Sequence, residues 1–420
     1  MINTITGNNK KYWFVMEPFV FVSIKNNTIF FYNTLDGFNI ESSDVDVFHL
    51  FTVLVNKKKS ILLLDEVLLK KENIVDLISV LRENFMADII DISLTKDHPF
   101  QFTPILNLQN SVERLKSDKN RSVGENLLEH LHEVTLFLKN VSDFPNKDYP
   151  VTTKECLIKN VNHDDLLSLD LIKELLNQLV SKKDLRINII IKNLIDYSEW
   201  FKLLYFLNTL PFKKRYSFQL NNINSMNNLY HLIDGRSKIN YIMDFSNPDD
   251  IDCLLSLNKR QIYDDRNEFS FLVDSERSLE KIEDYIDKQD DFKYHIIPVY
   301  NGGNINFFEN NVYMDKDDIL ESPISMRQIF INQTINIESF GKMSIVPGGN
   351  VFTNIFHTRI GNIKKKSVLE MIYSEMNTGI SWFNTRKSFP CNECLYQWLC
   401  ATPSVYESIF NKVNLCHVNL

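Results

Sequence analysis

The sequence predicts an α/β protein built around a partial barrel of six βα units, with a small domain before the barrel and a cysteine-bearing extension after it. Two patterns predict this class. Short apolar runs alternate with amphipathic, helix-length segments over residues 130–335, and four of the six cysteines fall within the last 30 residues. The chain has 420 residues, of which 44% are hydrophobic and 24% charged. This is ordinary globular composition, and the length allows one to three domains.

Residues 1–95 form the first predicted domain. Strand-like runs at 13–21 and 28–32 are joined by a Lys25-Asn26-Asn27 turn, in which the asparagines tolerate positive φ angles. A third short extended piece opens at Ile40. Helical or apolar stretches follow at 47–54, 62–71 and 74–85. Three strands followed by three helices is typical of a winged-helix-like domain.

A polar connector over residues 96–129 precedes the barrel, because the segment KSDKNRSVGEN is hydrophilic and contains Gly124. The six strand-length runs of the barrel lie at 131–139, 186–192, 215–220, 239–245, 268–273 and 294–300. Strands joined by helical crossovers pair in parallel, and apolar residues on both faces predict a sheet that is buried on both sides. Right-handed crossovers curl six such units into an open, partial (βα)6 barrel.

Residues 336–420 break this rhythm and form the carboxy-terminal extension. The segment GKMSIVPGGNVFTNIF predicts a β-hairpin that turns at Pro347-Gly348-Gly349-Asn350. A helix is expected after Ser367, which forms a capping box with Glu370 three residues later. The cysteine cluster follows this helix.

The charge balance excludes two classes of partner. The chain carries 46 Lys and Arg against 54 Asp and Glu, a net charge of −8, whereas binding of nucleic acid or of anionic membranes needs a basic face. No uninterrupted apolar run approaches the roughly 20 residues of a membrane span. The amino-terminal residues MINTITGNNKKYWF lack the apolar core of a signal peptide. We therefore expect a cytoplasmic protein with no nucleic-acid or membrane partner.

The cysteine cluster predicts a metal centre. Its spacing is Cys391-x2-Cys394-x5-Cys400-x15-Cys416, whereas Cys156 and Cys253 stand alone. A C-x2-C pair directs two thiolates at one metal, and four thiolates complete a tetrahedral zinc site or supply one ligand to each iron of a 4Fe–4S cluster. The alternative is that the four residues are small, buried, apolar side chains.

The tail also carries a family resemblance. The segments IVPGGNVFTN, RIGNI, SVLEMIY, PCNECLYQWLCATPSVYE and NLC resemble a SPASM domain, the extension of radical SAM enzymes that modify ribosomally made peptides. Full members hold two auxiliary 4Fe–4S clusters. The resemblance implies that Cys391, Cys394, Cys400 and Cys416 bind the more distal cluster. The ligands of the other cluster are altered, since Thr353 or Asn354, and Ser404, stand where the family has cysteines.

The motif that binds S-adenosylmethionine in radical SAM enzymes, C-x3-C-x2-C after the first barrel strand, occurs nowhere in the sequence. The segment NVSDFPNKDYPVTTKECL at that place holds only Cys156. The chain therefore resembles the pseudo-radical-SAM/SPASM proteins of GG-type Bacteroidales peptide systems. The resemblance implies a protein without radical SAM activity and without bound S-adenosylmethionine. It also implies binding to a precursor peptide with a Gly-Gly-type leader, to an intact radical SAM enzyme, or to both.

Residues 1–95 resemble the precursor-recognition domain of such systems, the type found in pyrroloquinoline quinone biosynthesis. These domains bind a leader peptide as an added strand, in a groove beside a helix. The alternative for this segment is a generic winged-helix or partner-docking domain.

Two other functions stay open: a zinc-stabilised interaction module, and an enzyme that uses non-radical chemistry in the barrel cavity. Polar residues near strand ends are candidates to line that cavity, or else ordinary caps and turn formers: Asn193, Gln219, Asp244, Asp274, His295, Tyr300 and the Gly302-Gly303 pair. His357 after the hairpin is either a ligand or a satisfied structural histidine.

Overall fold

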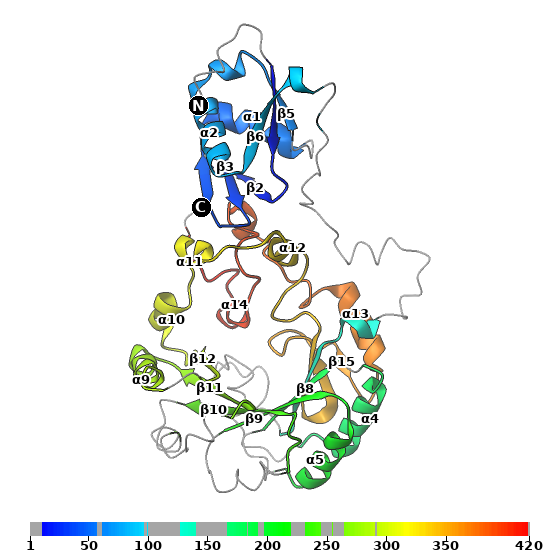
Figure 1. The fold of residues 1–420 in the computed structure, drawn as a ribbon. Coiled ribbons are helices and arrows are strands. Elements are labelled where there is room, and N and C mark those ends of the chain that lie inside the picture. The colour runs from blue at the N-terminus through cyan, green and yellow to red at the C-terminus, as the bar shows by residue number, and fades with distance from the viewer. Residues whose placement is uncertain are drawn as a thin grey trace.

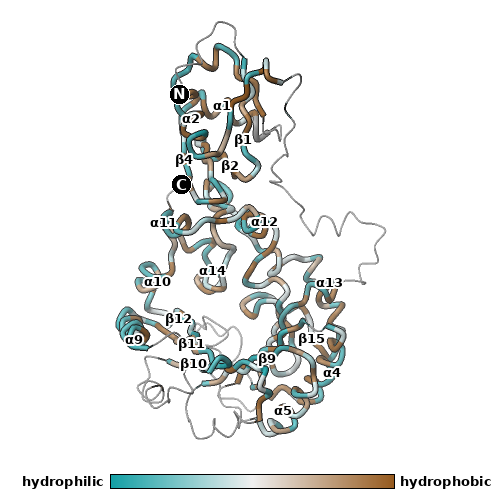
Figure 2. Tube along the Cα trace, viewed as in Figure 1, coloured by the Kyte–Doolittle hydropathy of each residue, from teal (hydrophilic) through white to brown (hydrophobic). Residues whose placement is uncertain are grey.

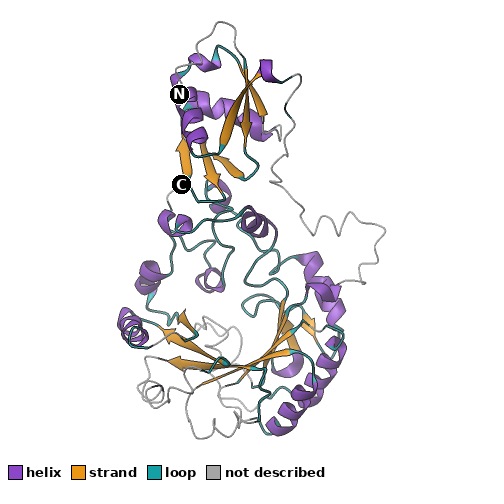
Figure 3. Ribbon diagram, in the orientation of Figure 1, coloured by secondary structure: helices purple, strands orange, loops and turns teal. Residues whose placement is uncertain are grey.

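The structure is a computed structural model that describes residues 11–56, 61–95, 99, 127–139, 166–182, 184–191, 197–219, 232–244, 254, 264–289 and 292–418. Cys156, Cys253 and Asn193 lie outside these residues, as do the loop after the first barrel strand and most of the predicted connector. The fold is mixed α/β, and its largest sheet is mainly parallel (Figures 1 and 3).

The amino-terminal unit contains two small antiparallel sheets, β5-β1-β6 and β2-β3-β4. Its elements are β1 (Tyr12–Met16), β2 (Val20–Lys25), β3 (Thr28–Asn33), β4 (Asn39–Ser42), α1 (Val45–Asn56), β5 (Ile61–Leu64), α2 (Glu72–Glu83) and β6 (Ala87–Asp91). The turn between β2 and β3 is confirmed, because Asn26 and Asn27 have φ angles of 47° and 60°. Side chains from both sheets and both helices share one buried core, which includes Phe14, Phe31 and Phe51.

The expected order of three strands followed by three helices is wrong in this unit. The apolar stretch 62–71 forms strand β5 and a short 3-10 turn at Leu68–Lys70, where a helix was expected. A short apolar run does not distinguish a buried helix from a strand, and here pairing with β1 decides for the strand. The winged-helix-like assignment stays a prediction.

The six predicted barrel strands are confirmed. They are β7 (Glu133–Phe137), β8 (Arg186–Ile190), β9 (Lys213–Gln219), β10 (Lys238–Asp244), β11 (Asn267–Val273) and β12 (Tyr294–Pro298). Each pairs in parallel with the next in chain order. Helix α4 (Leu169–Leu179) follows β7, α5 (Trp200–Thr209) follows β8 and α9 (Glu276–Ile286) follows β11.

The two faces of this sheet differ in chemistry. One face is apolar and packs against the helices, with Ile187, Tyr216 and Phe271 in the same core as Leu176 of α4. Helix α9 is largely hydrophilic on its surface and places the buried Ile282 against this core (Figure 2). The opposite, inner face is also buried but polar along its middle. The expectation of strands that are apolar on both faces is therefore wrong, although both faces are covered.

The predicted hairpin in the extension is confirmed, and it continues the barrel sheet. Strand β13 (Lys342–Ile345) is antiparallel to β14 (Asn350–Phe352), which pairs with β15 (Gly361–Asn362). Strand β13 is also parallel to β7, so the sheet order among the described residues is β12-β11-β10-β9-β8-β7-β13-β14-β15. Helix α13 (Val368–Thr378) begins at Ser367 with the expected capping box to Glu370. The extension thus occupies the free edge of the first barrel strand.

Further short helices link the barrel to the cysteine segment: α10 (Ile305–Asn311), α11 (Lys316–Leu320), α12 (Met326–Thr334) and α14 (Val405–Phe410). The sheet β2-β3-β4 lies directly against this region (Figure 1). Phe30 and Tyr32 share a buried cluster with Ile329, Tyr396 and Cys400. The amino-terminal unit and the cysteine segment therefore share one apolar core.

Candidate metal centre and the inner face of the sheet

The four tail cysteines are all free thiols within one compact segment of the fold. Cys391 begins a 3-10 turn, and the N–H of Cys394 donates to the carbonyl of Cys391 at 3.1 Å. Cys391 and Cys400 are buried, whereas Cys394 and Cys416 are half-buried. Cys416 is brought back to the segment before α11 by a parallel bridge to Met314.

The thiols share one electrostatic neighbourhood. Burial raises the pKa of Cys394, of Cys416 and, to about 11, of Cys400. The pKa of Cys400 also responds to charge on each of the other three cysteines, which oppose its ionisation, and to the Arg386 guanidinium, which favours it. The four cysteines therefore lie in the same part of the fold.

Arg386 supplies positive charge at this cluster. Its side chain is 8% exposed and forms an ion pair with Glu407 at 2.9 Å, and it donates to the Cys391 sulfur at 3.9 Å and to the carbonyl of Ala401. At the other end of the segment, the N–H of Val418 donates to the Cys416 sulfur at 3.2 Å. Donors of this kind offset the negative charge of thiolates and tune the metal that they bind.

The donor chemistry of this cluster fits iron or zinc, because four cysteines are the ligand set of structural zinc and of 4Fe–4S centres. Across the described part of the chain, however, no three His, Cys, Asp or Glu side chains are grouped closely enough to hold a metal ion. The four-cysteine metal centre therefore stays a prediction.

Asn354 and Ser404, which stand where SPASM domains have cysteine ligands, have structural roles in this chain. Ser404 is the N-cap of α14 and forms a capping box with Glu407, the carboxylate that also pairs with Arg386. Asn354 donates to the hydroxyl of Ser339 at 3.4 Å and accepts from the N–H of Phe356 at 3.0 Å. The serine and the asparagine thus hold the local backbone.

His357 is a satisfied structural histidine. Its Nδ1 and Nε2 lie 2.8 Å and 3.0 Å from the hydroxyls of Ser381 and Ser408. Beside it, the buried Glu375 accepts from the N–H groups of Ser381 and Trp382 at 2.7 and 2.8 Å. Burial raises the pKa of Glu375 and lowers that of His357. The interior of the extension is thus stabilised by polar contacts.

The inner face of the barrel sheet carries a buried polar layer across five strands. Asn188 donates to the Thr135 hydroxyl at 3.4 Å, Asn240 donates to Ser217 at 3.3 Å, and Ser270 donates to the Asn240 amide oxygen at 2.9 Å. All five side chains are buried, and one oxygen in the layer, Asn188 Oδ1, has no hydrogen-bond partner. Toward the carboxyl ends of the strands this layer gives way to an apolar cluster, which includes Phe137 and Leu272.

The strand-end candidates lie apart from one another. His295 lies at the amino-terminal end of β12, opposite the carboxyl ends at which it was expected. Asp274 is tied to the next loop, because its carboxylate and carbonyl accept from Asn301 and Asn304 at 3.4 and 2.7 Å. Tyr300 packs on Phe410 of α14 with ring centroids 4.5 Å apart.

Two further candidates from the sequence lie on neighbouring strands. Gln219 ends β9 and Asp244 ends β10, both at the carboxyl edge of the sheet. The Gly302-Gly303 pair follows β12 as a turn, in which Gly302 has a φ angle of 90°. Asn193, the remaining candidate, is outside the described residues. Among the described residues, the structure therefore assembles no site from these strand-end candidates.

No protein-family model and no curated protein matches the chain. Among solved structures, Streptococcus suis SuiB bound to precursor peptide SuiA has a TM-score of 0.43 and 12% identity, over 96% of this chain and 99% of that chain. SuiB bound to S-adenosylmethionine has a TM-score of 0.39 and 13% identity, over 96% and 98%. BtrN in complex with AdoMet and 2-DOIA has a TM-score of 0.31 and 10% identity, over 59% and 85%. Likeness at these scores does not establish the family or the activity of this chain.

Proposed function

We propose that this chain is an accessory protein of ribosomal peptide maturation. It binds a precursor peptide, or the radical SAM enzyme that acts on that peptide, and carries out no radical SAM chemistry of its own. The observation that carries the proposal is the tail cluster of four free cysteines with SPASM-like spacing, in a chain whose sequence lacks C-x3-C-x2-C. Such a protein raises the local concentration of the peptide beside its enzyme without new chemistry. Its place is the cytoplasm, where thiols stay reduced.

The cysteines Cys391, Cys394, Cys400 and Cys416 would hold one 4Fe–4S cluster, with one thiolate to each iron. When bound, such a cluster transfers single electrons and also cross-links the segment that carries it. Arg386 and the N–H of Val418 already donate toward two of the four sulfurs, and such donors would offset the negative charge of metal-bound thiolates. A single zinc ion in the same place would make the chain a zinc-stabilised interaction module.

The amino-terminal unit is the proposed binding site for a Gly-Gly-type leader peptide. Among the described strands, β5 pairs with β1 alone and therefore has a free edge. Leu63 on this strand is 42% exposed, and Val67 just after it is 67% exposed. A peptide added as a strand gains backbone hydrogen bonds from such an edge and packs its own apolar residues on the exposed side chains. We therefore assign the leader to the β5 edge.

Metal analysis tests the identity of the centre. Anaerobically purified protein is expected to be brown, to absorb near ~400 nm and to contain about four irons per chain. About one zinc per chain would instead support the interaction module. Absence of both metals would overturn the metal centre, and conversion of S-adenosylmethionine to deoxyadenosine by the purified chain would overturn the non-catalytic assignment.

A cysteine variant tests the ligand assignment. Cys391→Ser removes one of the four thiolates, so metal content should fall and the segment after residue 386 should become sensitive to protease. Cys156→Ser is the matched control, because this cysteine is outside the cluster in the sequence. Unchanged metal content and protease resistance in Cys391→Ser would show that the assignment is wrong.

A further inference from the structure

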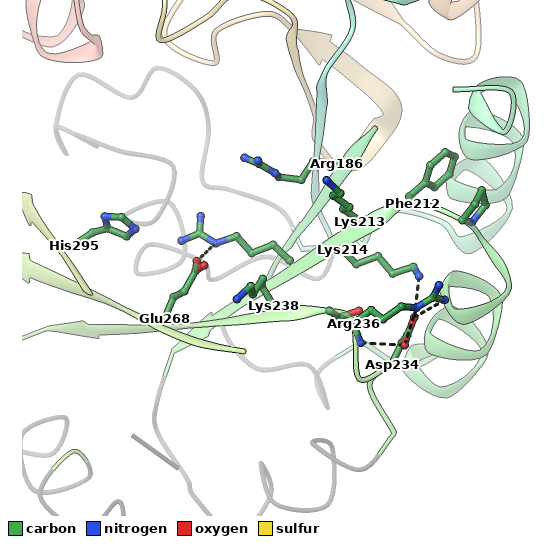
Figure 4. Close-up of a pocket in the computed structure, with 12 residues that line it drawn as sticks. Arg186, Phe212, Lys213, Lys214, Asp234, Arg236, Lys238, Glu268 and His295 are labelled. Atoms are coloured by element: carbon green, nitrogen blue, oxygen red, sulfur yellow. Dashed lines mark hydrogen bonds and ion pairs between the residues drawn. The ribbon is translucent and has the colours of Figure 1, made fainter. Parts of the chain in front are cut away.

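A second candidate site lies at the amino-terminal ends of the barrel strands. Strands β8, β9 and β10 each begin with basic residues: Arg186 on β8, Lys213, Lys214 and Arg215 on β9, and Lys238 on β10. Because the strands are parallel and neighbouring, these residues lie at one edge of the sheet, with Lys214 on the face opposite that of Lys213 and Arg215. They line a pocket of about 750 Å³ that extends to His295 on β12 (Figure 4). This edge is opposite the carboxyl ends, where barrels usually carry their chemistry.

The pocket concentrates positive charge in an acidic protein. Its lining residues include six Lys and Arg side chains but only two carboxylates, Asp234 and Glu268. Asp234 pairs with Lys214 at 3.6 Å and with Arg236 at 3.2 Å, and Glu268 pairs with Arg215 at 2.9 Å. With His295 neutral, the lining carries a net charge of six minus two, or +4, whereas the whole chain carries −8.

Two of the six cations, Lys213 and Lys238, form no ion pair among the described residues, and a third, Arg186, is largely exposed. Lys238 donates to the backbone carbonyl of Asp265 at 2.5 Å, a neutral partner. Arg186 is 59% exposed and pairs with Glu133, a carboxylate outside the pocket lining, at 3.5 Å. Lys213 is exposed at the start of β9. It lies two residues before Arg215, so both side chains are on the inner face of the sheet. A partly enclosed cationic surface focuses its field on small anions.

Two of the remaining cations, Lys214 and Arg215, are held in place by ion pairs, whereas Arg236 is 81% exposed. Lys214 is 3% exposed, and its ammonium group donates to the carbonyl of Leu210 at 3.1 Å. Phe212, 4% exposed, supports one wall of the pocket. A buried lysine placed beside a carboxylate and a carbonyl keeps its position when a ligand enters, so the site needs little rearrangement.

We propose that this pocket binds a small molecule with two or more phosphate groups. Its volume is in the range of small-molecule sites. Lysine ammonium groups bind phosphate as point charges, and Arg186 adds a planar fork that suits phosphate oxygens. An extended acidic peptide would need a long open groove, whereas Arg186, Lys213 and Lys238 line one pocket. The site is independent of the cysteine cluster and of the β5 edge.

Calorimetry with inorganic triphosphate tests the proposal. The full chain should bind it saturably at constant ionic strength, and sulfate should bind more weakly because it carries fewer charges. The double variant Lys213→Glu/Lys238→Glu should raise the Kd at least about tenfold. Both lysines begin strands, and neither forms an ion pair in the described structure, so the fold should remain intact, as checked by circular dichroism.

A matched control separates the pocket from net charge. Lys281→Glu/Lys288→Glu makes the same charge change on exposed residues at helix α9 and just after it, away from the pocket lining. This variant should bind triphosphate with the wild-type Kd. An equal loss in both variants, or no saturable binding by the wild type, would overturn the proposal.

Two more ligands define the chemistry. If ATP binds more tightly than triphosphate, the natural ligand carries a nucleoside; equal binding means that phosphate groups alone are recognised. Both results support a phosphate-bearing ligand. Tighter binding of hexaglutamate than of triphosphate would overturn it, because the pocket would then serve peptide carboxylates.

Discussion

Arg386 is the residue on which the charge balance of the carboxy-terminal extension depends. Its guanidinium is 8% exposed, and it contacts Glu407 and the Cys391 sulfur from within a buried segment. Its own carbonyl accepts from the side chain of Gln397 at 2.6 Å. A buried charge is tolerated only with a partner, so Arg386 and Glu407 stabilise the fold as a pair.

A double-mutant cycle measures this pair. Arg386→Met leaves the carboxylate of Glu407 buried without its cation and should cost about 3–5 kcal/mol of unfolding free energy. Glu407→Gln in the same chain removes the stranded charge and keeps an oxygen that accepts from Ser404, so part of the loss should be recovered. Urea denaturation of samples with equal metal content measures the unfolding free energy of the single and of the double variant. A loss below about 1 kcal/mol in Arg386→Met would mean that solvent screens the pair.

At the scale of elements, sequence patterns predicted the repeating strand and helix units of the fold. The alternation of apolar runs and helices located all six parallel strands, and the capping box located the start of α13. Patterns did not predict β5, because four apolar residues suit a helix or a strand until a partner strand decides. The pairing of β13 with β7 joins residues about 200 positions apart, and local sequence holds no signal for it.

The same limit applies to the sites. The grouping of the four cysteines into one metal site rests on their spacing and stays a prediction, because a C-x2-C pair and a tail cluster can be read from the sequence alone. Arg386 was missed, since a single arginine looks like a surface charge until its burial is known. The basic pocket did have a signal: lysine or arginine begins three successive predicted strands, and parallel pairing turns that pattern into a cluster.

Binding of the leader peptide at the β5 edge can be tested on this one strand. Leu63→Lys places a charge on the exposed side of β5 and should weaken leader-peptide binding at least about tenfold, measured by fluorescence anisotropy. Leu94→Lys is the matched control, because Leu94 is 81% exposed and follows β6 at the opposite edge of the same sheet. Binding that survives Leu63→Lys would place the groove elsewhere. Deletion of residues 1–95 is a poorer test, because it uncovers Tyr396 and Cys400.

At the scale of the whole molecule, the carboxy-terminal extension connects the other two parts. It adds β13 to the barrel sheet and packs its cysteine segment on β2-β3-β4 (Figure 1). Polar contacts surround that second junction. Tyr32 accepts from the N–H of Ile324 at 2.8 Å, Lys25 donates to the carbonyl of Asn392 at 2.6 Å, and Glu41 pairs with Lys316 at 2.7 Å. Among the described residues, no helix is both long and apolar enough to cross a bilayer.

Acid should weaken this junction. Burial alone would raise the pKa of Glu41, but hydrogen bonds from Lys316 and Tyr396 outweigh it and hold the pKa below the usual 4.5. A carboxylate with a depressed folded-state pKa stabilises the folded form above its unfolded pKa, and the contribution is lost as pH falls through the folded value. The protection of the β4 amides, which is the intrinsic exchange rate divided by the measured rate at the same pH, should therefore be constant above about pH 5 and should decrease below about pH 4.

Two variants check that assignment. Glu41→Gln should show faster exchange in β4 at neutral pH and no acid-dependent step from this group. Asp88→Asn, on the same domain but paired with Arg82 at 3.2 Å, should keep the acid step of the wild type. If β4 of Glu41→Gln loses as much protection from hydrogen exchange in acid as the wild type does, other carboxylates cause the loss.

The shared apolar core of Phe30, Tyr32, Tyr396 and Cys400 has a consequence for handling the protein. Separation of the amino-terminal unit from the cysteine segment would therefore expose the thiol of Cys400 to solvent and dissolved oxygen, so protein purified under reducing conditions should keep this junction closed.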